Sequence, residues 1–240
     1  MVAYDVIGDI LIVGEDVTNE KCEELLEKKN INVVLRKKGI HHGEFRTQDM
    51  EVVCGEKRKE TLYKENGVQL KLDVEKCYFS PRLGTERMRI ASLVKEGEKV
   101  LVLFSGVGPY CIVLAKNTEA VKIVGVEKNK VAHDYAVWNC RKYPYVKLFN
   151  EDAKDFSFDE KFDRVLMPLP KSAEDFLDVA LKCVKKKGIV HFYDFLHEND
   201  IPDVALEKIK SKCKCKVLDV VKCGQYSPGK FRICVDFQVL

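Results

Sequence analysis

The second half of the sequence carries glycines and acidic residues at the spacing of a nucleoside-binding site. In "LFSGVGPY", Gly106 and Gly108 follow an apolar run, and glycines at the end of a strand let a ligand approach the backbone closely. The next apolar run ends in Glu127, where a carboxylate can accept hydrogen bonds from ribose hydroxyls. The third run is followed by Asp152, which is placed to bind an adenine amino group. Together these residues predict an adenosine-containing cofactor.

Two adenosine cofactors suit this pattern, a nicotinamide dinucleotide and S-adenosylmethionine. The dinucleotide motif is G-x-G-x-x-G, and Cys111 stands where its third glycine belongs. An antiparallel hairpin expected at the C-terminus also favours the methyltransferase version of such a sheet. The sequence therefore favours S-adenosylmethionine.

The stretch "DRVLMPLPKSA" ends a further apolar run at a proline. In many enzymes that methylate a nitrogen of a base, a strand at this place ends in Asn or Asp, whose side chain holds the amino group. Pro168 has neither a polar side-chain atom nor an N–H. This stretch is a damaged site, an unrelated loop, or a site in which other residues hold the nucleophile while the prolines fix the turn and keep their carbonyl acceptors.

The elements that must position these residues alternate between strand and helix from about residue 97 onward. Apolar runs at 98–105, 121–127, 162–168 and 188–195 alternate with amphipathic segments, one of which predicts a helix over 171–186. The segments 216–223 and 231–240 suit a closing antiparallel hairpin. This order predicts an α/β domain over 91–240, a Rossmann-like, mostly parallel sheet with helices on both faces.

Residues 1–90 predict a small α+β domain with a linker motif. Two apolar runs flank an amphipathic segment for which Thr18 is a plausible N-cap. Asn66-Gly67 lies between two extended segments and predicts a hairpin.

Composition indicates a cytoplasmic globular protein. The chain has 240 residues, 46% hydrophobic and 33% charged, and a net charge of +3. It shows no membrane-spanning run and no secretory signal, and its ten cysteines include no C-x-x-C pair. We expect reduced thiols, no metal, no membrane partner and a monomer. His191 is interpreted as a structural histidine at a strand end, with a ligand-binding role as the alternative.

Several stretches match one family in order along essentially the whole chain. "GEFRT" (Gly43 to Thr47), "YFSPRLGTER" (Tyr78 to Arg87), "FSGVGPY", "GVEKN" and "MPLPKSAEDFLD" resemble the archaeal and eukaryotic tRNA (guanine-N1)-methyltransferases. The resemblance implies a class I S-adenosylmethionine-dependent methyltransferase fold preceded by a small α+β domain. It also implies methyl transfer to N1 of the guanosine 3′ of the anticodon, so the expected partner is the anticodon loop of tRNA.

The resemblance assigns roles by position. Arg46 is expected to stabilise negative charge on the guanine, and Glu86 to accept the N1 proton. Tyr78 is expected beside the cofactor's methionine end and the target base. The residues expected to bind the cofactor are Arg82, Phe104, Gly106, Gly108, Pro109, Glu127, Lys128, Asn129, Asp152, Ala153, Pro168, Leu169 and Pro170.

The sequence departs from the family at three points. Val102 stands where close relatives carry an Asp, which puts one cofactor contact in doubt. The chain starts at the "IGDILIV" strand, whereas the longer archaeal members carry an additional N-terminal domain, so we expect altered tRNA recognition. Pro168-Leu169-Pro170 replaces Asn-Leu-Pro and points to the archaeal branch linked to wyosine, whose members can also methylate C7 of the 4-demethylwyosine intermediate. The alternatives are an aminocarboxypropyl transferase of wyosine synthesis and a non-catalytic tRNA-binding module.

Overall fold

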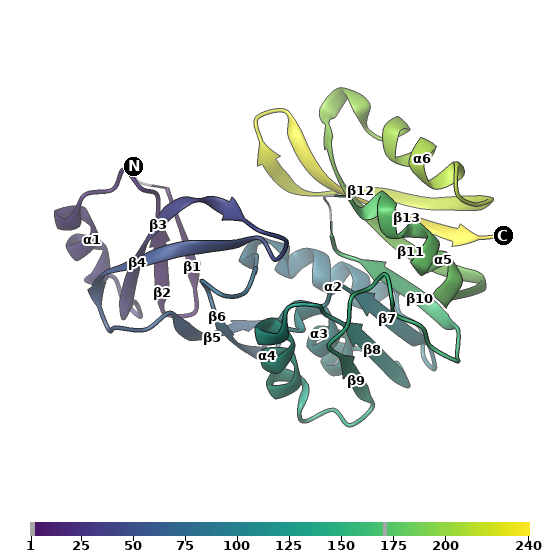
Figure 1. Cartoon of the computed structure of the whole chain (residues 1–240), viewed down its shortest axis with the longest axis horizontal. Coiled ribbons are helices and arrows are strands. Elements are labelled where there is room, and N and C mark those ends of the chain that lie inside the picture. Colours follow the sequence, from purple (N-terminus) through teal and green to yellow (C-terminus); the bar gives the residue numbers. More distant parts are fainter. Residues whose placement is uncertain (1–2, 170–171) are drawn as a thin grey trace.

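The computed structural model describes residues 3–169 and 172–240, and its largest element is a seven-stranded sheet (Figure 1). The strand order is β12-β13-β11-β10-β7-β8-β9, with β12 and β13 antiparallel to their neighbours and the other pairs parallel. The chain runs outward from β7 to β9 and then returns to the other side of β7 with β10. This reversal creates the switch point at which ligands of open α/β sheets bind. The strands are β7 (Lys99–Leu103), β8 (Lys122–Val126), β9 (Val146–Phe149), β10 (Phe162–Met167), β11 (Val184–His197), β12 (Cys215–Ser227) and β13 (Lys230–Val239).

Both faces of this sheet are covered because its central strands are apolar on both sides. Along β7, Leu101 and Leu103 belong to one buried cluster, whereas Val100 and Val102 belong to another, as expected from side chains that alternate between faces. The first cluster is covered by α5 (Leu177–Cys183) and α6 (Asp203–Lys210), and the second by α2 (Gly84–Leu93) and α3 (Pro109–Asn117). The helix α4 (Lys130–Cys140) packs against β9 and against β6 (Val68–Asp73), a strand outside this sheet.

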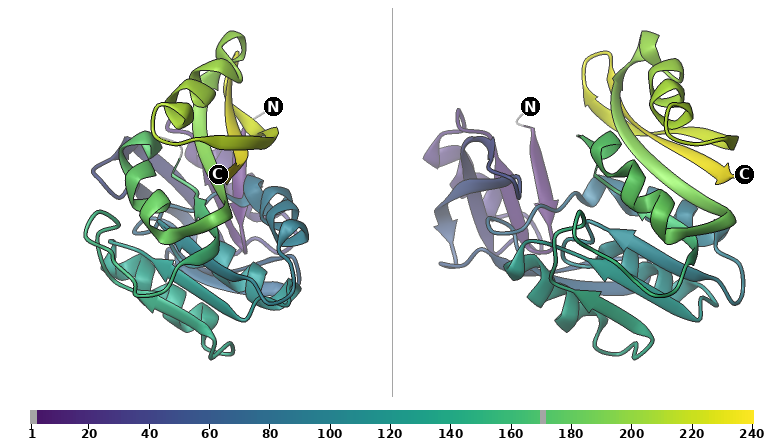
Figure 2. Two further views of the ribbon diagram at one scale, coloured as in Figure 1. Left: turned by 90° about the vertical axis from the view of Figure 1, so that its right-hand side faces the viewer. Right: turned by 45° about the vertical axis from the view of Figure 1, so that its right-hand side comes forward.

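The N-terminal unit is a separate four-stranded sheet with the order β1-β2-β3-β4 (Figure 2). Thr18 caps α1 (Asn19–Leu26) by accepting a hydrogen bond of 3.3 Å from the N–H of Lys21, which confirms the predicted cap. The strands are β1 (Tyr4–Ile7), β2 (Ile10–Val13), β3 (Val33–His42) and β4 (Thr47–Gly55).

A hairpin of β5 (Glu60–Glu65) and β6 (Val68–Asp73) joins the two units. Asn66 and Gly67 form its turn with φ values of 47° and 74°, which confirms the hairpin predicted from this dipeptide. On β6, Leu70 packs into a core cluster of the large sheet, whereas Leu72 packs into a cluster shared with the small sheet. The domain boundary near residue 90 stays a prediction, and this position lies within α2, whose Ile90 and Ala91 pack into a core cluster of the large sheet.

The helix predicted over 171–186 is shorter in the structure. Lys171 lies outside the described residues, a 3-10 turn spans Ala173–Phe176, and α5 ends at Cys183. The following residues "VKKKG" open β11, where Val184 pairs with Phe162 and Lys187 has a φ of 61°. Lysines favour helices locally, but Lys185, Lys186 and Lys187 lie in a register irregularity between Val184 and Ile189, two positions that pair with β10. None of the helices in the described residues is long and apolar enough to cross a membrane.

Candidate functional site

The turn after β7 brings the backbone to the carboxyl end of the sheet in a left-handed conformation. Phe104, Gly106 and Gly108 have φ values of 56°, 55° and 80°, and Pro109 opens α3. A Cβ on Gly108 would lie 3.1 Å from that of Ala136, so this glycine is needed for packing. A Cβ on Gly106 would meet only the Tyr78 carbonyl oxygen, at 3.9 Å. The backbone at Gly106 therefore leaves space for a close approach.

Glu127 lies at the end of β8 and faces this turn. Its Oε2 accepts a hydrogen bond of 2.8 Å from the Gly106 N–H, and its Oε1 accepts one of 2.7 Å from the Asn129 N–H. Burial raises the pKa of Glu127, and these N–H donors oppose the shift. A buried acceptor beside an open glycine turn is suited to the hydroxyls of a ribose.

Asp152 follows β9 and is paired with Lys128. The Lys128 Nζ lies 2.8 Å from the Asp152 carboxylate and 2.6 Å from that of Glu44, in the loop between β3 and β4. The ion pair with Lys128 lowers the pKa of Asp152, and the N–H of Lys154 contributes. The adjacent Ala153 is buried in the core of the sheet.

Asn129 acts as a structural cap in addition to any cofactor contact. Its side-chain oxygen accepts a hydrogen bond of 3.0 Å from the Val131 N–H at the start of α4, and its amide donates one of 3.0 Å to the Lys76 carbonyl.

At the end of β10, the Leu169 N–H donates to the Met167 carbonyl at 2.7 Å, which makes a tight turn at Pro168. Pro170 lies outside the described residues.

A concave region between the two units, the cleft, has a volume of about 380 Å³. Tyr78 lines it, with the Arg46 guanidinium 4.7 Å from the ring centroid and the His41 ring edge-on at 5.7 Å. Arg232 donates a hydrogen bond of 3.0 Å to the Tyr78 hydroxyl. The walls come from the small sheet, the segment 74–83 and the β12–β13 hairpin. Three segments far apart in sequence thus surround one tyrosine.

The loop between β3 and β4 holds Arg46 in place. Arg46 has a φ of 52°, and its carbonyl accepts a hydrogen bond of 2.9 Å from His41 Nδ1. Burial lowers the pKa of His41, and the positive charge of Arg46 acts in the same direction. At the edge of the cleft, Arg82 is exposed and pairs with Asp5 at 2.6 Å. The structure thus brings together Arg46, Tyr78 and Arg82 but assigns Arg82 no contact with the turn at Gly106.

Glu86 is placed behind the cleft and does not line it. Its carboxylate accepts hydrogen bonds of 2.7 and 2.8 Å from Arg89 and one of 2.6 Å from the Tyr193 hydroxyl. The residue is 5% exposed. Cys223, which lines the cleft, lies beside Glu86, and burial together with that negative charge raises the pKa of its thiol.

Arg89 connects Glu86 to a buried chain of charged and polar groups that crosses the sheet. Arg89 also pairs with Asp236 at 2.6 Å, and Asp236 accepts a hydrogen bond from His191. Arg164 donates to His191 Nε2 at 2.7 Å and pairs with Glu98 at 2.8 Å. Because Nε2 accepts, Nδ1 carries the proton, and burial lowers the pKa of this neutral imidazole. His191 is therefore held as a structural residue, but it lies in the middle of β11 and not at a strand end as expected.

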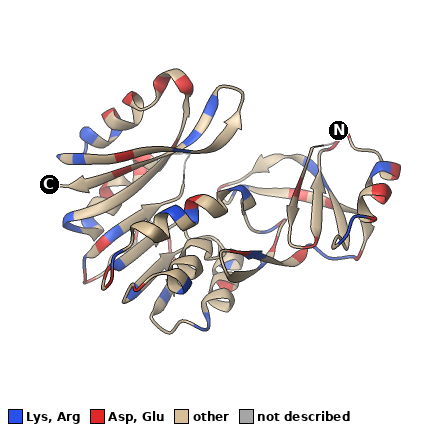
Figure 3. Cartoon of the chain, turned by 180° about the vertical axis from the view of Figure 1, so that it is seen from behind, with Lys and Arg blue, Asp and Glu red and all other residues tan. Residues whose placement is uncertain are grey.

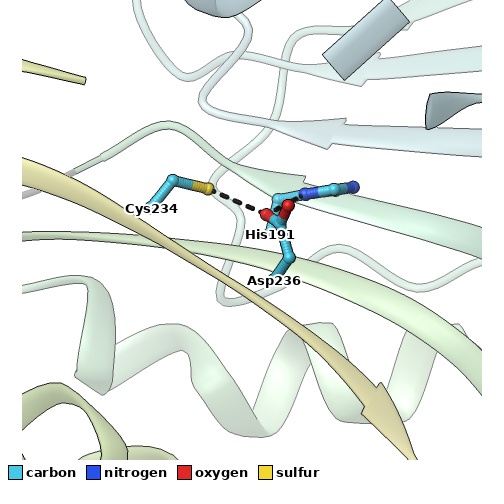
Figure 4. A group of neighbouring side chains, drawn as sticks. All are labelled: His191, Cys234 and Asp236. Carbon is cyan, nitrogen blue, oxygen red and sulfur yellow. Dashed lines mark hydrogen bonds and ion pairs between the residues drawn. The ribbon is translucent and has the colours of Figure 1, made fainter. Parts of the chain in front are cut away.

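His191, Cys234 and Asp236 also form a grouping with the composition of a metal site, since their ligand atoms lie within 4.8 Å of one another (Figure 4). Arg164 donates to His191 Nε2, which leaves the proton on Nδ1, the nitrogen that faces Asp236, and Arg89 occupies the Asp236 carboxylate. Two guanidinium cations in contact with the grouping disfavour a bound cation. All ten cysteines are free thiols.

Sequence reasoning missed Arg89, Arg232 and Asp236. A signal was present in "FRICVDFQVL", where Arg232 and Asp236 interrupt an otherwise apolar strand four residues apart. Side chains at that spacing lie on one face of a strand. A charged pair on one face of a buried strand requires partners, and these come from α2 and the segment before it.

These features define a class I methyltransferase fold. They are an open α/β sheet with a closing antiparallel hairpin, a glycine turn, and an acidic residue at the end of the second parallel strand. Comparison with known families agrees, since residues 61–221 match the TRM5/TYW2 methyltransferase domain and residues 2–58 match the TYW2 N-terminal domain. The chain belongs to the TRM5/TYW2 family, which confirms the predicted resemblance.

Both branches of this family are represented among similar proteins. The tRNA (guanine(37)-N(1))-methyltransferase Trm5b of Pyrococcus abyssi is 36% identical over 99% of this chain and 74% of its own length. A tRNA(Phe) (4-demethylwyosine(37)-C(7)) aminocarboxypropyltransferase of Methanocaldococcus jannaschii is 30% identical over 98% of this chain and 97% of its own length. The Nanoarchaeum equitans protein Taw22, named as a methyltransferase of both guanine(37)-N(1) and 4-demethylwyosine(37), is 29% identical over 99% of this chain and 100% of its own length.

Solved structures confirm the predicted fold. The complex of aTrm5 and tRNALeu superposes with a TM-score of 0.91 at 33% identity, covering 100% of this chain and 72% of that one. Methanocaldococcus jannaschii TYW2 in complex with AdoMet superposes with a TM-score of 0.78 at 27% identity, covering 99% of this chain and 100% of that one.

Proposed function

We propose that this protein is a tRNA methyltransferase that transfers the methyl group of S-adenosylmethionine to N1 of the guanosine 3′ of the anticodon. The observation that carries the proposal is the position of Tyr78. Its carbonyl borders the open turn at Gly106, and its ring lines the cleft beside Arg46. One residue therefore borders both a nucleoside-binding turn and a pocket of the size and charge needed for a base.

The residues at the carboxyl ends of the strands suit this cofactor. Glu127 would accept hydrogen bonds from the ribose, Asp152 would receive the adenine amino group, and Phe104 would cover the ring. When bound, S-adenosylmethionine supplies an electrophilic methyl group. The AdoMet complex of the Methanocaldococcus jannaschii relative supports this assignment.

The cleft residues would prepare the guanine as a nucleophile. Guanine N1 attacks weakly while it carries its proton, and negative charge develops at O6 as the proton leaves. Arg46 would stabilise that charge, because a fixed guanidinium in a partly enclosed site interacts strongly with a developing oxyanion. The base would have to leave the stack of the anticodon loop to reach Tyr78.

We propose Glu86 as the acceptor of the N1 proton, and the structure adds a condition to that role. Its carboxylate is held by Arg89 and Tyr193 behind Cys223. It must exchange at least one of these hydrogen bonds for the substrate before it can act as a base. Glu86→Gln and Arg46→Ala should each reduce methyl transfer by about a hundredfold or more. Near-normal rates would overturn these roles.

A second candidate function is aminocarboxypropyl transfer from the same cofactor. The match to the TYW2 N-terminal domain and the full-length similarity to the Methanocaldococcus jannaschii transferase favour it. We also propose methylation of C7 of 4-demethylwyosine as an additional activity, since the Nanoarchaeum equitans relative is named for both reactions. The turn at Pro168 offers no side-chain hydrogen bond and would admit a larger tricyclic base.

One experiment separates these functions. The protein is incubated with unmodified tRNA, or with tRNA carrying 4-demethylwyosine, and with S-adenosylmethionine labelled on the methyl group or on the carboxyl group. Methyl label alone on unmodified tRNA supports the principal proposal, and carboxyl label on the RNA overturns it in favour of aminocarboxypropyl transfer. Label on neither substrate supports a non-catalytic tRNA-binding module. We further propose that the protein acts as a cytoplasmic monomer on the anticodon loop.

A further inference from the structure

The most unusual charged residue of the cleft is Arg232, which is buried without an anionic partner among the described residues. It is 9% exposed, its Nε has no hydrogen-bond partner, and its guanidinium donates only to the neutral Tyr78 hydroxyl. The other deeply buried arginines are neutralised, since Arg87 pairs with Glu65 and Arg164 with Glu98. An unpaired buried charge is strongly unfavourable, so Arg232 is where the fold leaves room for an anion.

The surroundings of Arg232 indicate what kind of anion enters. On the neighbouring strand, Phe195 pairs with Arg232 in register, and the guanidinium lies 5.0 Å from its ring centroid. Phe195 in turn lies 4.4 Å from the ring of Tyr226, which is 57% exposed at the tip of the β12–β13 hairpin. Gly224 pairs with Arg232 from the other side, and a Cβ there would meet nothing within 4 Å. A cation beside the half-buried Phe195 and the exposed Tyr226, with open space next to it, matches the combination of basic and aromatic side chains that binds single-stranded nucleic acid.

We propose that Arg232 binds a phosphate of the RNA next to the target nucleotide, while Phe195 and Tyr226 form a ledge on which the adjacent base stacks. This inference rests on the proposed function and adds a contact that the resemblance did not assign. The hydrogen bond from Arg232 to Tyr78 couples the phosphate contact to a residue that lines the cleft. The cofactor's carboxylate is the other anion that could approach the cleft, and the experiment distinguishes the two.

The test is the salt dependence of RNA binding. A synthetic anticodon stem-loop is bound to the wild type, Arg232→Lys, Arg232→Gln and the control Arg141→Gln in the presence of S-adenosylhomocysteine, between about 50 and 200 mM salt. Arg141 is an exposed arginine that stacks on Trp138 at 3.6 Å, away from the cleft. Arg232→Gln should weaken binding about tenfold and reduce the slope of log K against log salt by about 0.7 to 0.9, the value of one lost phosphate contact. Arg232→Lys and Arg141→Gln should keep the wild-type slope.

A second measurement locates the phosphate. Single neutral methylphosphonate linkages are placed on each side of the target nucleotide. One of them should weaken wild-type binding about tenfold but leave Arg232→Gln binding unchanged, because that variant no longer contacts the phosphate. An unchanged salt slope in Arg232→Gln would overturn the inference, and so would a loss confined to cofactor affinity. A wild type that methylates neither the stem-loop nor unmodified tRNA contradicts the proposed function, whereas a methylating wild type with an unchanged Arg232→Gln slope contradicts only this inference.

Discussion

At the scale of single residues, the side chains beneath the cleft are held by opposite charges. Arg89 bridges Glu86 and Asp236, both of which are almost fully buried. A carboxylate removed from water is tolerated only when cations and hydrogen-bond donors compensate it. The position of Glu86 therefore depends on Arg89 as much as on its own helix.

Replacing Arg89 with methionine tests this dependence. The variant leaves Glu86 and Asp236 buried without their shared cation, so the free energy of unfolding should fall by about 3–5 kcal/mol. The matched control is Lys212→Met, which breaks the exposed pair with Asp178 and should cost no more than about 1 kcal/mol. Urea denaturation of both variants measures the difference. Equal effects would show that the network does not hold these carboxylates.

Glu127 gives a pH-dependent prediction. Burial raises its pKa above the ordinary value of 4.5, so the carboxylate takes up a proton at a higher pH than a free glutamate does. Only the ionised form accepts hydrogen bonds from both ribose hydroxyls. S-adenosylmethionine affinity should therefore fall as the pH decreases through this raised pKa.

Glu127→Gln should lower the affinity for S-adenosylmethionine about tenfold near neutral pH and abolish the dependence on pH, as measured by calorimetry. The control is Glu151→Gln, an exposed residue after the next strand, which should match the wild type. A pH dependence that persists in Glu127→Gln would assign the titration to another group.

At this scale the sequence indicated candidate cofactor-binding residues at strand ends more readily than the contacts between side chains. Gly106, Glu127 and Asp152 were recognisable because each follows an apolar run, and strand ends meet at one edge of a parallel sheet. Arg89, one partner of Glu86, lies three residues along the same helix. The other partner, Tyr193, comes from β11, 107 residues away, and Asp236, which shares Arg89, comes from β13, 147 residues from Arg89. Spacing along the chain carries no information about such a contact.

At the scale of elements, short polar contacts fix where helices begin and how the linker runs. Asn129 caps α4 and also donates to the Lys76 carbonyl, two residues before Tyr78. The N-terminus of α4 and the approach of the linker to the cleft are thus set by one side chain. The lysine-rich start of β11 is the opposite case, because a local preference for helix is overridden where Val184 and Ile189, on either side of the lysines, pair with β10.

Substitutions at Asn129 separate the two contacts. Asn129→Ala removes both and should lower the free energy of unfolding by about 1–2 kcal/mol. Asn129→Asp keeps the capping oxygen but loses the amide donor, so it should retain most of the stability. Urea denaturation compares the two variants. If Asn129→Asp is as unstable as Asn129→Ala, the contact with Lys76 matters more than the cap.

At the scale of the whole molecule, the two units are joined by apolar contacts. Charged residues of both signs are distributed over both units (Figure 3). The ion pairs between the units, Asp5 with Arg82 and Glu44 with Lys128, include exposed side chains, and such pairs contribute about 1 kcal/mol or less. The buried apolar cluster that the two units share involves more residues than these ion pairs do. It contains Ile7, Ile10, Ile12, Val33, Leu35, Met50, Leu72, Val74, Cys77, Val107 and Ala132.

Because the units share this cluster, they should unfold together. Trp138, the only tryptophan, reports on α4 in the large unit, while hydrogen exchange of β3 reports on the small one. Both probes should show a single coincident urea transition in the wild type. Leu72, which is 0% exposed, lies at the centre of the shared contact.

Leu72→Ala should lower the free energy of unfolding by about 2–5 kcal/mol and separate the two transitions, because the cavity lies between the units. The control is Leu11→Ala, equally buried but in a cluster formed by the small unit alone. It should weaken the protection of β3 while the Trp138 transition changes much less. If Leu72→Ala leaves the transitions coincident and Leu11→Ala destabilises both probes equally, the two units form one cooperative domain whose cleft cannot open without global unfolding.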